Sequence, residues 1–336
     1  MIRILSVVAL DEPTVRRIEA LPGVALRLLP PTDAAWDVPD ELTRGTNVIL
    51  SKLPPRNLDA MPDLKMIQIT TVGYEHLRQR GFADRPVRVC NARGLFDTAI
   101  AEWNLAMMIA LTRDLRGMIR NQEQARWEKD ARFQQEIRGK VVGLWGYGGI
   151  GRETARLAKA FGVTVHVLTR SGVGPRGNAY TLPGTGDPEG VLPDRVFVSG
   201  QETDFLSGLD FLILTLPHTQ QSTGLVGAKE LRTLPRSAFV LNPARGLIIQ
   251  EAALLAALRE GWIAGAALDT HFKSPLPPEH PLWGFANVIM TPHISGADKS
   301  RLFSGRLADL FAQNVERFVM GRPLLNEVTP AEWREA

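Results

Sequence analysis

The stretch from residue 141 to residue 170 constrains the fold of this chain more than any other. It opens with the apolar run Val141–Trp145, which is too short for a helix and predicts a buried parallel strand. Gly146, Gly148 and Gly151 follow with GxGxxG spacing. In such a loop the first glycine permits a tight turn, the second lets a diphosphate approach the backbone, and the third lets the next helix pack closely on its strand. The pattern therefore predicts a strand, a glycine-rich turn and a helix.

The helix is expected to start at Ile150 and to stop at Gly162, and its N-terminus offers backbone N–H groups and a positive dipole end to phosphate. Its expected apolar face comprises Thr154, Leu157, Ala158 and Phe161. A second apolar run, 163–168, completes a βαβ unit. A glycine motif alone is weak, but these four features in this order predict a dinucleotide-binding domain.

The end of the second strand indicates which dinucleotide is bound. A site that selects NAD places an acidic residue there to bind both ribose hydroxyls, whereas this chain has Thr169, Arg170 and Ser171. The two hydroxyls can donate to a 2′-phosphate and the guanidinium can pair with it. The alternative is that Arg170 is only a solvated arginine at a strand end. We expect NADP(H) to be the preferred cofactor, with NAD(H) also possible.

The composition bounds the class of protein. With 336 residues, 44% hydrophobic and 22% charged, the chain is long enough for two globular domains. The net charge is only +3 and the basic residues are dispersed, so nucleic acid is not expected as a partner. Cys90 is the only cysteine, which excludes an internal disulfide, makes a cysteine metal site implausible and fits a reducing cytoplasm. No signal pattern opens the chain and its most apolar stretch, 100–111, is too short to span a bilayer, so we expect no membrane association.

Short apolar runs alternate with candidate helices along the rest of the chain, which predicts an α/β fold. The expected strands lie at 2–8, 24–29, 47–50, 65–69, 87–90, 210–216, 238–241, 264–268 and 287–290. The helix at 100–111 is apolar nearly all round and should be buried in the molecule or in a subunit interface. The charged segment 113–138 separates it from the glycine motif. The Gly- and Pro-rich stretch 172–195 is expected to be a mobile surface loop near the adenosine end of the cofactor.

Two side chains that follow predicted strands could carry chemistry. His293, in TPHISG, lies where open α/β sheets bind ligands, and imidazole exchanges protons near neutral pH. Arg245, in NPARG, could fix a carboxylate with two parallel N–H donors. The structural alternatives are a core histidine and an ordinary salt bridge. Residues 71–73 could form an anion-binding nest of amides or a simple turn.

The motifs together resemble the D-isomer-specific 2-hydroxyacid dehydrogenase family over almost the whole chain. The matching segments are LKMIQITTVGYEHL from Leu64, Ala101 with Glu102, GYGGIG, LTLPHT, NPARG, AALD, PLPPEHPLW and TPHISG. The resemblance implies two Rossmann-like α/β domains with doubly wound parallel sheets. A cofactor domain at 102–289 would be inserted into a discontinuous catalytic domain formed by 1–101 and 290–336, and the chain would form a homodimer.

The resemblance also implies roles for individual residues. Arg245 would bind the carboxylate and carbonyl of the substrate, His293 would exchange the proton, and the amides of Val72 and Gly73 would hold the carboxylate. Asp269 would contact the nicotinamide amide. The cofactor-binding set would comprise Gly146, Gly148, Gly149, Ile150, Gly151, Thr169, Arg170, Ser171, Leu216, Pro217, Pro243, Ala244, Asp269 and His293.

One position departs from the family pattern LDVFxxEP. This chain has LDTHFKSP, so Ser274 replaces the glutamate that pairs with the catalytic histidine, and His271 replaces the aromatic residue. A carboxylate would raise the pKa of the histidine, whereas a serine can only hydrogen-bond to it. The formate dehydrogenase branch also lacks this carboxylate, so its loss is compatible with activity.

The sequence thus predicts an NADPH-dependent reductase that interconverts a small 2-oxo acid, of the glyoxylate or hydroxypyruvate type, and its D-2-hydroxy acid. The alternative is a nucleotide-binding member with vestigial catalysis that acts as a sensor or interaction protein. The joint presence of Arg245, His293 and Asp269 favours the enzyme, and Ser274 favours the alternative.

Overall fold

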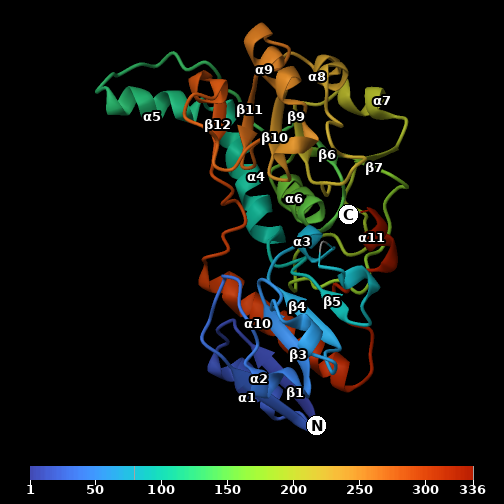
Figure 1. Ribbon diagram of the computed structural model, residues 1–336. Coiled ribbons are helices and arrows are strands. Elements are labelled where there is room, and N and C mark those ends of the chain that lie inside the picture. Colours follow the sequence, from blue (N-terminus) through green and yellow to red (C-terminus); the bar gives the residue numbers. More distant parts are fainter. Residues whose placement is uncertain (79, 336) are drawn as a thin grey trace. The chain divides into compact units, whose positions relative to one another are not determined.

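The computed structural model describes residues 1–78 and 80–335 (Figure 1). The chain forms two compact units. The first comprises residues 1–96, 177–181 and 298–336, and the second comprises residues 97–176 and 182–297. The chain therefore enters the second unit at Asp97, close to the expected limit of 102, and leaves it after Ala297, beyond the expected 289. The assignment of substrate and cofactor roles to these units stays a prediction.

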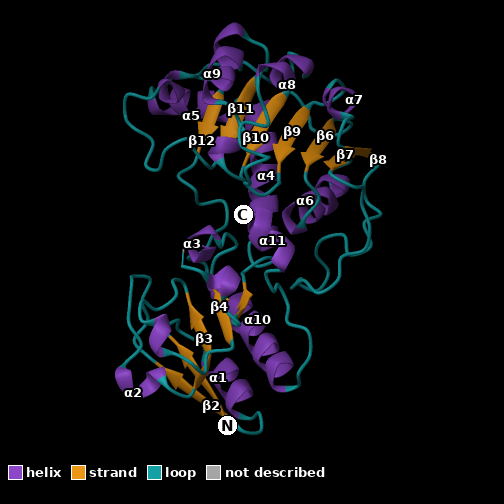
Figure 2. Cartoon of the chain, turned by 45° about the vertical axis from the view of Figure 1, so that its right-hand side comes forward, coloured by secondary structure: helices purple, strands orange, loops and turns teal. Residues whose placement is uncertain are grey.

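The first unit is built on a five-stranded sheet of order β2-β1-β3-β4-β5, and every pair in it is parallel (Figure 2). Its strands are β1 (Ile2–Ser6), β2 (Val24–Leu28), β3 (Thr46–Ser51), β4 (Met66–Ile69) and β5 (Arg88–Cys90). Its helices are α1 (Glu12–Glu19), α2 (Asp40–Thr43), α3 (Glu75–Arg78), α10 (Arg301–Val319) and α11 (Pro330–Glu335). The expected runs at 2–8, 24–29, 65–69 and 87–90 contain β1, β2, β4 and β5, and the run at 47–50 lies within β3, because each is an apolar run bounded by turn residues.

The second unit is built on a seven-stranded parallel sheet of order β12-β11-β10-β9-β6-β7-β8. Its strands are β6 (Val141–Trp145), β7 (Thr164–Thr169), β8 (Arg195–Val198), β9 (Phe211–Leu214), β10 (Phe239–Asn242), β11 (Gly265–Leu268) and β12 (Val288–Met290). Its helices are α4 (Asp97–Thr112), α5 (Leu115–Glu123), α6 (Gly149–Ala160), α7 (Glu202–Leu206), α8 (Ala228–Thr233) and α9 (Glu251–Glu260). The chain order reverses direction between β6 and β9, so this sheet is doubly wound, as predicted.

Alternate residues of these strands enter two separate cores, one on each face of the sheet. Leu144 packs with side chains of α4 and α6, whereas the next residue, Trp145, packs with side chains of α7, α8 and α9. The helix predicted at 100–111 is α4. It is buried on one face against α6 through residues such as Leu105 and Met108, while Ile109 is 38% exposed.

Two predictions about helices need correction. The buried face of α6 contains Thr154 and Ala158, as expected, but it also contains the charged residues Arg152 and Glu153, whereas Phe161 is 47% exposed. The charged segment 113–138 contains the helix α5, which has no buried residue. Among the described residues, no helix is long and apolar enough to cross a membrane.

Candidate functional site

The predicted cofactor and substrate residues of the second unit lie after the carboxyl ends of neighbouring strands. Because all seven strands are parallel, these ends share one edge of the sheet, which is where open α/β sheets bind ligands. From β12 to β7 the strand ends carry His293; Asp269 and Ser274; Pro243, Ala244 and Arg245; Leu216 and Pro217; Gly146, Gly148, Gly149, Ile150 and Gly151; and Thr169, Arg170 and Ser171. The structure thus brings residues far apart in sequence into one row, with the glycine-rich loop at the switch point between β6 and β9.

The glycine-rich loop has the geometry that its spacing predicts. Gly146 has a φ of +103°, and a Cβ placed on it would lie 2.9 Å from backbone atoms of Thr215 and Leu216. A Cβ on Gly151 would lie 2.7 Å from the carbonyl oxygen of Gly146, so only glycine lets α6 approach β6 this closely. Gly148, the N-cap of α6, has no heavy atom within 4 Å of its Cβ position. Packing therefore requires glycine at Gly146 and Gly151, whereas Gly148 leaves room beside the helix N-terminus for a diphosphate.

The turn after β7 carries the three residues predicted to select the cofactor. The Thr169 hydroxyl donates to the carbonyl of Gly172 and accepts from its N–H, both at 2.9 Å, so this side chain closes the turn. Arg170 and Ser171 are exposed beyond it. The position that holds a carboxylate in NAD-selective sites therefore carries no acid, as the sequence indicates.

The connection 172–195 is fastened to α6, contrary to the expectation of a mobile loop. Arg152 of α6, only 7% exposed, donates from Nη2 to the carbonyl of Gly174 (2.6 Å) and from Nη1 to the carbonyl of Asp187. The carboxylate of Asp187 accepts from the Tyr147 hydroxyl at 2.6 Å. Glu153 of α6 accepts from the N–H of Gly186 at 2.6 Å. Sequence composition indicated a loop, but it could not show that buried charges of the helix hold it.

These contacts change the acidity of the groups involved. Burial acts to raise the pKa of Asp187, but the hydrogen bonds from Tyr147 and from the amides of Leu192 and Val191, with the charge of Arg152, outweigh it and lower the pKa. Burial and the bond to Asp187 raise the pKa of Tyr147. The carboxylate is thus ionised and the phenol neutral at physiological pH.

Arg245 is positioned by the turn after β10. The Asn242 side chain donates to the carbonyl of Arg245 (2.9 Å) and accepts from the N–H of Ala244 (3.1 Å), which fixes the backbone on both sides of the arginine. A Cβ on Gly246 would lie 2.3 Å from the backbone carbonyl of His271. The turns after β10 and β11 therefore touch, and this contact requires a glycine directly after Arg245.

Asp269 organises the turn that carries His293. Its side chain is fully buried, and Oδ1 accepts from the Thr291 hydroxyl (2.6 Å) and the Ile294 N–H (2.9 Å). Oδ2 accepts from the N–H (3.0 Å) and the hydroxyl of Ser295. His293 itself donates its backbone N–H to the carbonyl of Asp269 at 2.8 Å and has a φ of +58°. Four bonds to one carboxylate thus hold an imidazole, whose side chain is exposed, in a backbone conformation uncommon for residues other than glycine.

The departures from the family pattern lie on the same turn as Asp269. Ser274 and the neighbouring Lys273 are exposed. The ring of His271 is bonded through Nε2 to the carbonyl of Thr291 at 2.9 Å, and its buried Nδ1 has no hydrogen-bond partner among the described residues. His271 therefore links the turns after β11 and β12 where the family has an aromatic residue.

Val72 and Gly73 belong to the first unit, in the turn after β4. The Thr71 hydroxyl donates to the carbonyl of Gly73 (2.8 Å), and the Asn91 side chain donates to the carbonyl of Val72 (3.1 Å). The carbonyl of Thr71 accepts from the N–H of Ala92 at 2.9 Å. These bonds define the turn through its carbonyl groups, and Val72 is 36% exposed.

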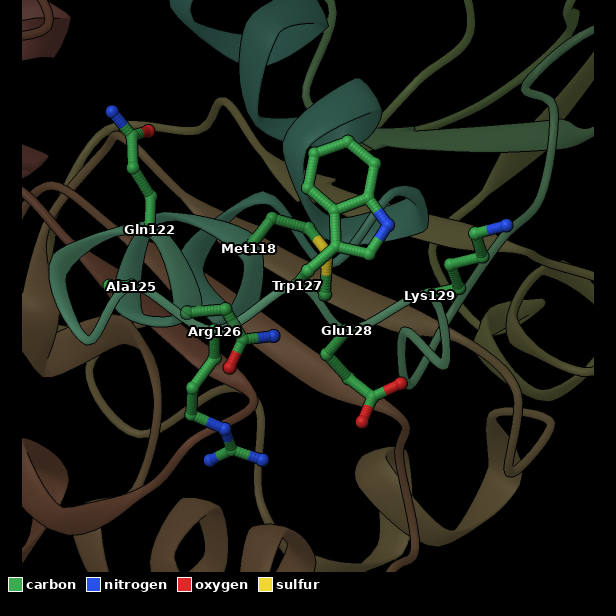
Figure 3. A pocket seen from close by; sticks show the side chains of 8 residues that line it. Met118, Gln122, Ala125, Arg126, Trp127, Glu128 and Lys129 are labelled. Carbon is green, nitrogen blue, oxygen red and sulfur yellow. The ribbon is translucent and has the colours of Figure 1, made fainter.

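A hollow lies at the end of α5, in the segment that separates α4 from β6 (Figure 3). Trp127, which follows the helix, is 91% exposed, and Leu115 and Ile119 on the helix are 49% and 47% exposed. The hollow is lined by Met118, Asn121, Gln122, Ala125, Arg126, Trp127, Glu128 and Lys129. From the sequence we expected only a charged segment here, and the amphipathic pattern of α5 is the signal that would have revealed an exposed apolar surface.

Residues 105–295 match the family model described as the D-isomer specific 2-hydroxyacid dehydrogenase, NAD binding domain. The chain belongs to this family. It is 31% identical to a glyoxylate reductase of Thermofilum pendens over 82% of this chain and 77% of that protein. Among solved structures, a D-isomer specific 2-hydroxyacid dehydrogenase of Xanthobacter autotrophicus in complex with NADPH and MES is 26% identical, with a TM-score of 0.76, over 98% of this chain and 99% of that one.

An NADPH-dependent glyoxylate/hydroxypyruvate reductase of Sinorhizobium meliloti, in complex with citrate, is 28% identical with a TM-score of 0.72, and the match covers 98% of both chains. The predicted family and α/β fold class are thereby confirmed. The protein is an oxidoreductase of the D-2-hydroxyacid dehydrogenase type that uses a nicotinamide cofactor.

Proposed function

We propose that this enzyme prefers NADPH and reduces a small 2-oxo acid of the glyoxylate or hydroxypyruvate type to its D-2-hydroxy acid. The observation that carries the cofactor preference is the turn after β7, where Arg170 and Ser171 are exposed in place of a ribose-binding acid. A carboxylate there would repel a 2′-phosphate, whereas a guanidinium attracts it.

The row of strand ends supports the proposed chemistry. When bound, the nicotinamide cofactor supplies the hydride. Arg245 binds the substrate carboxylate and polarises the neighbouring carbonyl with its N–H donors, and His293 donates the proton to the carbonyl oxygen. Contacts within the turns after β10, β11 and β12 fix the backbone at both residues, which favours a preorganised site. From the family resemblance we also propose that the amides of Val72 and Gly73 bind the carboxylate and that Asp269 contributes to nicotinamide binding.

The substrate class is supported by the names of the related proteins and by the donor set. Relatives at 28–31% identity include glyoxylate reductases and a glyoxylate/hydroxypyruvate reductase. An arginine and a proton donor at the same edge of the sheet suit a short 2-oxo acid, which has one carboxylate next to its carbonyl.

The decisive assay is NADPH oxidation with a panel of 2-oxo acids that includes glyoxylate, hydroxypyruvate and pyruvate. We expect turnover to be highest with one of the first two, and an Arg245→Gln variant to lose most of its kcat/KM while it still binds NADPH. Cofactor preference is measured by titration: Arg170→Gln should weaken NADPH binding about tenfold or more and leave NADH unchanged. Equal affinities of the unmodified protein for NADH and NADPH would refute the preference.

Ser274 favours one competing proposal, a nucleotide-binding protein with vestigial catalysis that acts as a sensor or interaction partner. A serine in place of the family's glutamate supplies no charge that would stabilise a protonated histidine. Tight NADPH binding with no oxidation in the presence of any acid of the panel would support this alternative over the reductase.

We further propose that the enzyme is a homodimer in which α5 and the residues after it contact the partner. Leu115, Ile119 and Trp127 expose apolar surface on one short segment, which is typical of an interface. Sedimentation should then give about twice the 37.0 kDa mass of the chain. Ile119→Asp should shift it toward the monomer, whereas Val191→Asp, at an exposed position elsewhere, should not. A monomeric unmodified protein would refute the proposal.

A further inference from the structure

The connection between β7 and β8 brings an arginine onto the glycine-rich loop. Arg176 Nη1 would lie 2.5 Å from a Cβ placed on Gly149, and Asp97 Oδ2 would lie 1.7 Å from it. These two atoms are 3.8 Å apart, and the side chains of Arg176 and Asp97 are only 22% and 17% exposed. Gly149 is the first residue of α6, directly after the N-cap Gly148. A guanidinium therefore lies, largely shielded, at the helix end where a dinucleotide places its diphosphate.

The position of Arg176 is set by the same helix. Its backbone N–H donates to the carbonyl of Pro188 at 2.9 Å, which closes the connection on itself. On one side of Arg176, the carbonyl of Gly174 accepts from Arg152 at 2.6 Å, and on the other side the N–H of Gly186 donates to Glu153 at 2.6 Å. Both anchors belong to α6 and are buried. Arg176 is thus held in place relative to the N-terminus of α6 before any ligand arrives.

The charges at this point require a cation. The carboxylate of Asp97 touches Gly149 and would repel an incoming diphosphate. The guanidinium beside it offsets that repulsion and can offer several N–H donors to phosphate oxygens. The open space next to Gly148 gives the diphosphate room within reach of the same helix end.

We propose that Arg176 binds the cofactor diphosphate, which NADH and NADPH share, and that Asp97 positions its guanidinium. The connection 172–195 is then part of the cofactor site. Arg170 and Arg176 serve different phosphates: the first the 2′-phosphate found only in NADPH, the second the diphosphate found in both cofactors. The proposal rests on nicotinamide cofactor use by the family and is independent of the preference for NADPH.

Two nucleotide fragments separate these roles. ADP carries a diphosphate and no 2′-phosphate, whereas 2′-AMP carries a 2′-phosphate and no diphosphate. Calorimetric titration of Arg176→Gln should show ADP and NADH binding weakened about tenfold or more, with 2′-AMP changed by less than about twofold. Arg170→Gln should show the reverse for the two fragments. Arg176→Lys, which keeps the charge, should recover part of the ADP affinity.

Two controls guard the interpretation. Arg259→Gln removes an exposed arginine from the last turn of α9 and should leave all affinities unchanged. Thermal unfolding without ligand should show that the Arg176 variants fold as the unmodified protein does. Unchanged ADP binding in Arg176→Gln, or loss of 2′-AMP binding instead, would overturn the proposal. Tighter ADP binding would also overturn it, because Arg176 and Asp97 would then obstruct the site. Equal NADH and NADPH affinities of the unmodified protein would refute only the cofactor preference.

Discussion

Replacing Asp269 with asparagine tests whether this residue holds the catalytic turn. The substitution keeps the shape of the side chain but turns one acceptor oxygen into an NH2 donor. On the Oδ1 side the Thr291 hydroxyl can rotate and accept, but the Ile294 N–H cannot. On the Oδ2 side the Ser295 hydroxyl can likewise rotate and accept, but the Ser295 N–H cannot. In either orientation one backbone N–H faces another donor at a fully buried site.

The magnitude follows from this count of bonds. A hydrogen bond to a charged group contributes about 1.5–3 kcal/mol, and a buried donor without a partner costs about 1–3 kcal/mol. We therefore expect Asp269→Asn to lower the stability of the second unit by about 3 kcal/mol, and its unfolding temperature by about 6–12 °C. His293 has an uncommon positive φ that these bonds maintain. Displacement of the His293 imidazole should reduce kcat/KM by about a hundredfold.

Thermal unfolding and steady-state kinetics measure the two effects on the same preparation. Asp204→Asn, at an exposed position in the first turn of α7, is the matched control and should change neither. An unchanged unfolding temperature with a large loss of NADPH affinity would contradict our reasoning. It would indicate that Asp269 acts mainly on the nicotinamide amide, as the family resemblance implies, and not on the turn.

Three further predictions concern other parts of the second unit. Gly151→Ala places a Cβ 2.7 Å from the carbonyl of Gly146, so it should displace α6 and weaken cofactor binding more than about tenfold in a titration; normal binding would contradict the close approach. Ser274→Glu should raise the pKa of His293 and move the falling limb of the pH–rate profile upward by about one pH unit; an unmoved profile in a variant that binds NADPH would mean that no such pairing forms. Because the folded pKa of Asp187 is lowered below 3.8, its contribution to stability is present above that value and is lost as the pH falls through the folded pKa. The unfolding temperatures of Asp187→Asn and the unmodified protein should therefore differ most at neutral pH and converge as the pH falls below 3.8, and a constant difference would refute this.

The sequence predicted those elements whose apolar runs are continuous and capped. The strand Val141–Trp145 was placed at its observed bounds, and the helix α10 begins after Ser300, whose hydroxyl accepts from the Phe303 N–H at 3.1 Å as an N-cap. The edge strand β8 was missed because it follows an irregular connection and buries only one of its four residues. The helix α5 was missed because its apolar residues are few and none of them is buried.

The candidate site was predictable where chemistry follows a strand end. Arg245 and His293 could be singled out because each directly follows an expected strand, and parallel strands end at one edge. The role of Asp269 in the turn could not be predicted, because its four bonds depend on the pairing of β11 with β12. Arg152 and Glu153 were also overlooked, since charged residues on a helix are expected to face solvent. The loop groups that they bind, at Gly174, Gly186 and Asp187, lie more than 20 residues away, and no periodicity reveals them.

The arrangement of one functional group per strand end separates two properties of the enzyme. The residues after β7 and those after β10 are three strand spacings apart, or about 14 Å at about 4.8 Å per spacing, and β12 is two spacings further. Substitutions separated by more than about 10 Å, without shared partners, usually have additive free energies. Cofactor choice and substrate choice should therefore vary independently in this scaffold. A variant redesigned at Arg170 to accept NADH should keep its ranking of 2-oxo acids, and descendants of one ancestral gene could exchange either property without a compensating change in the other.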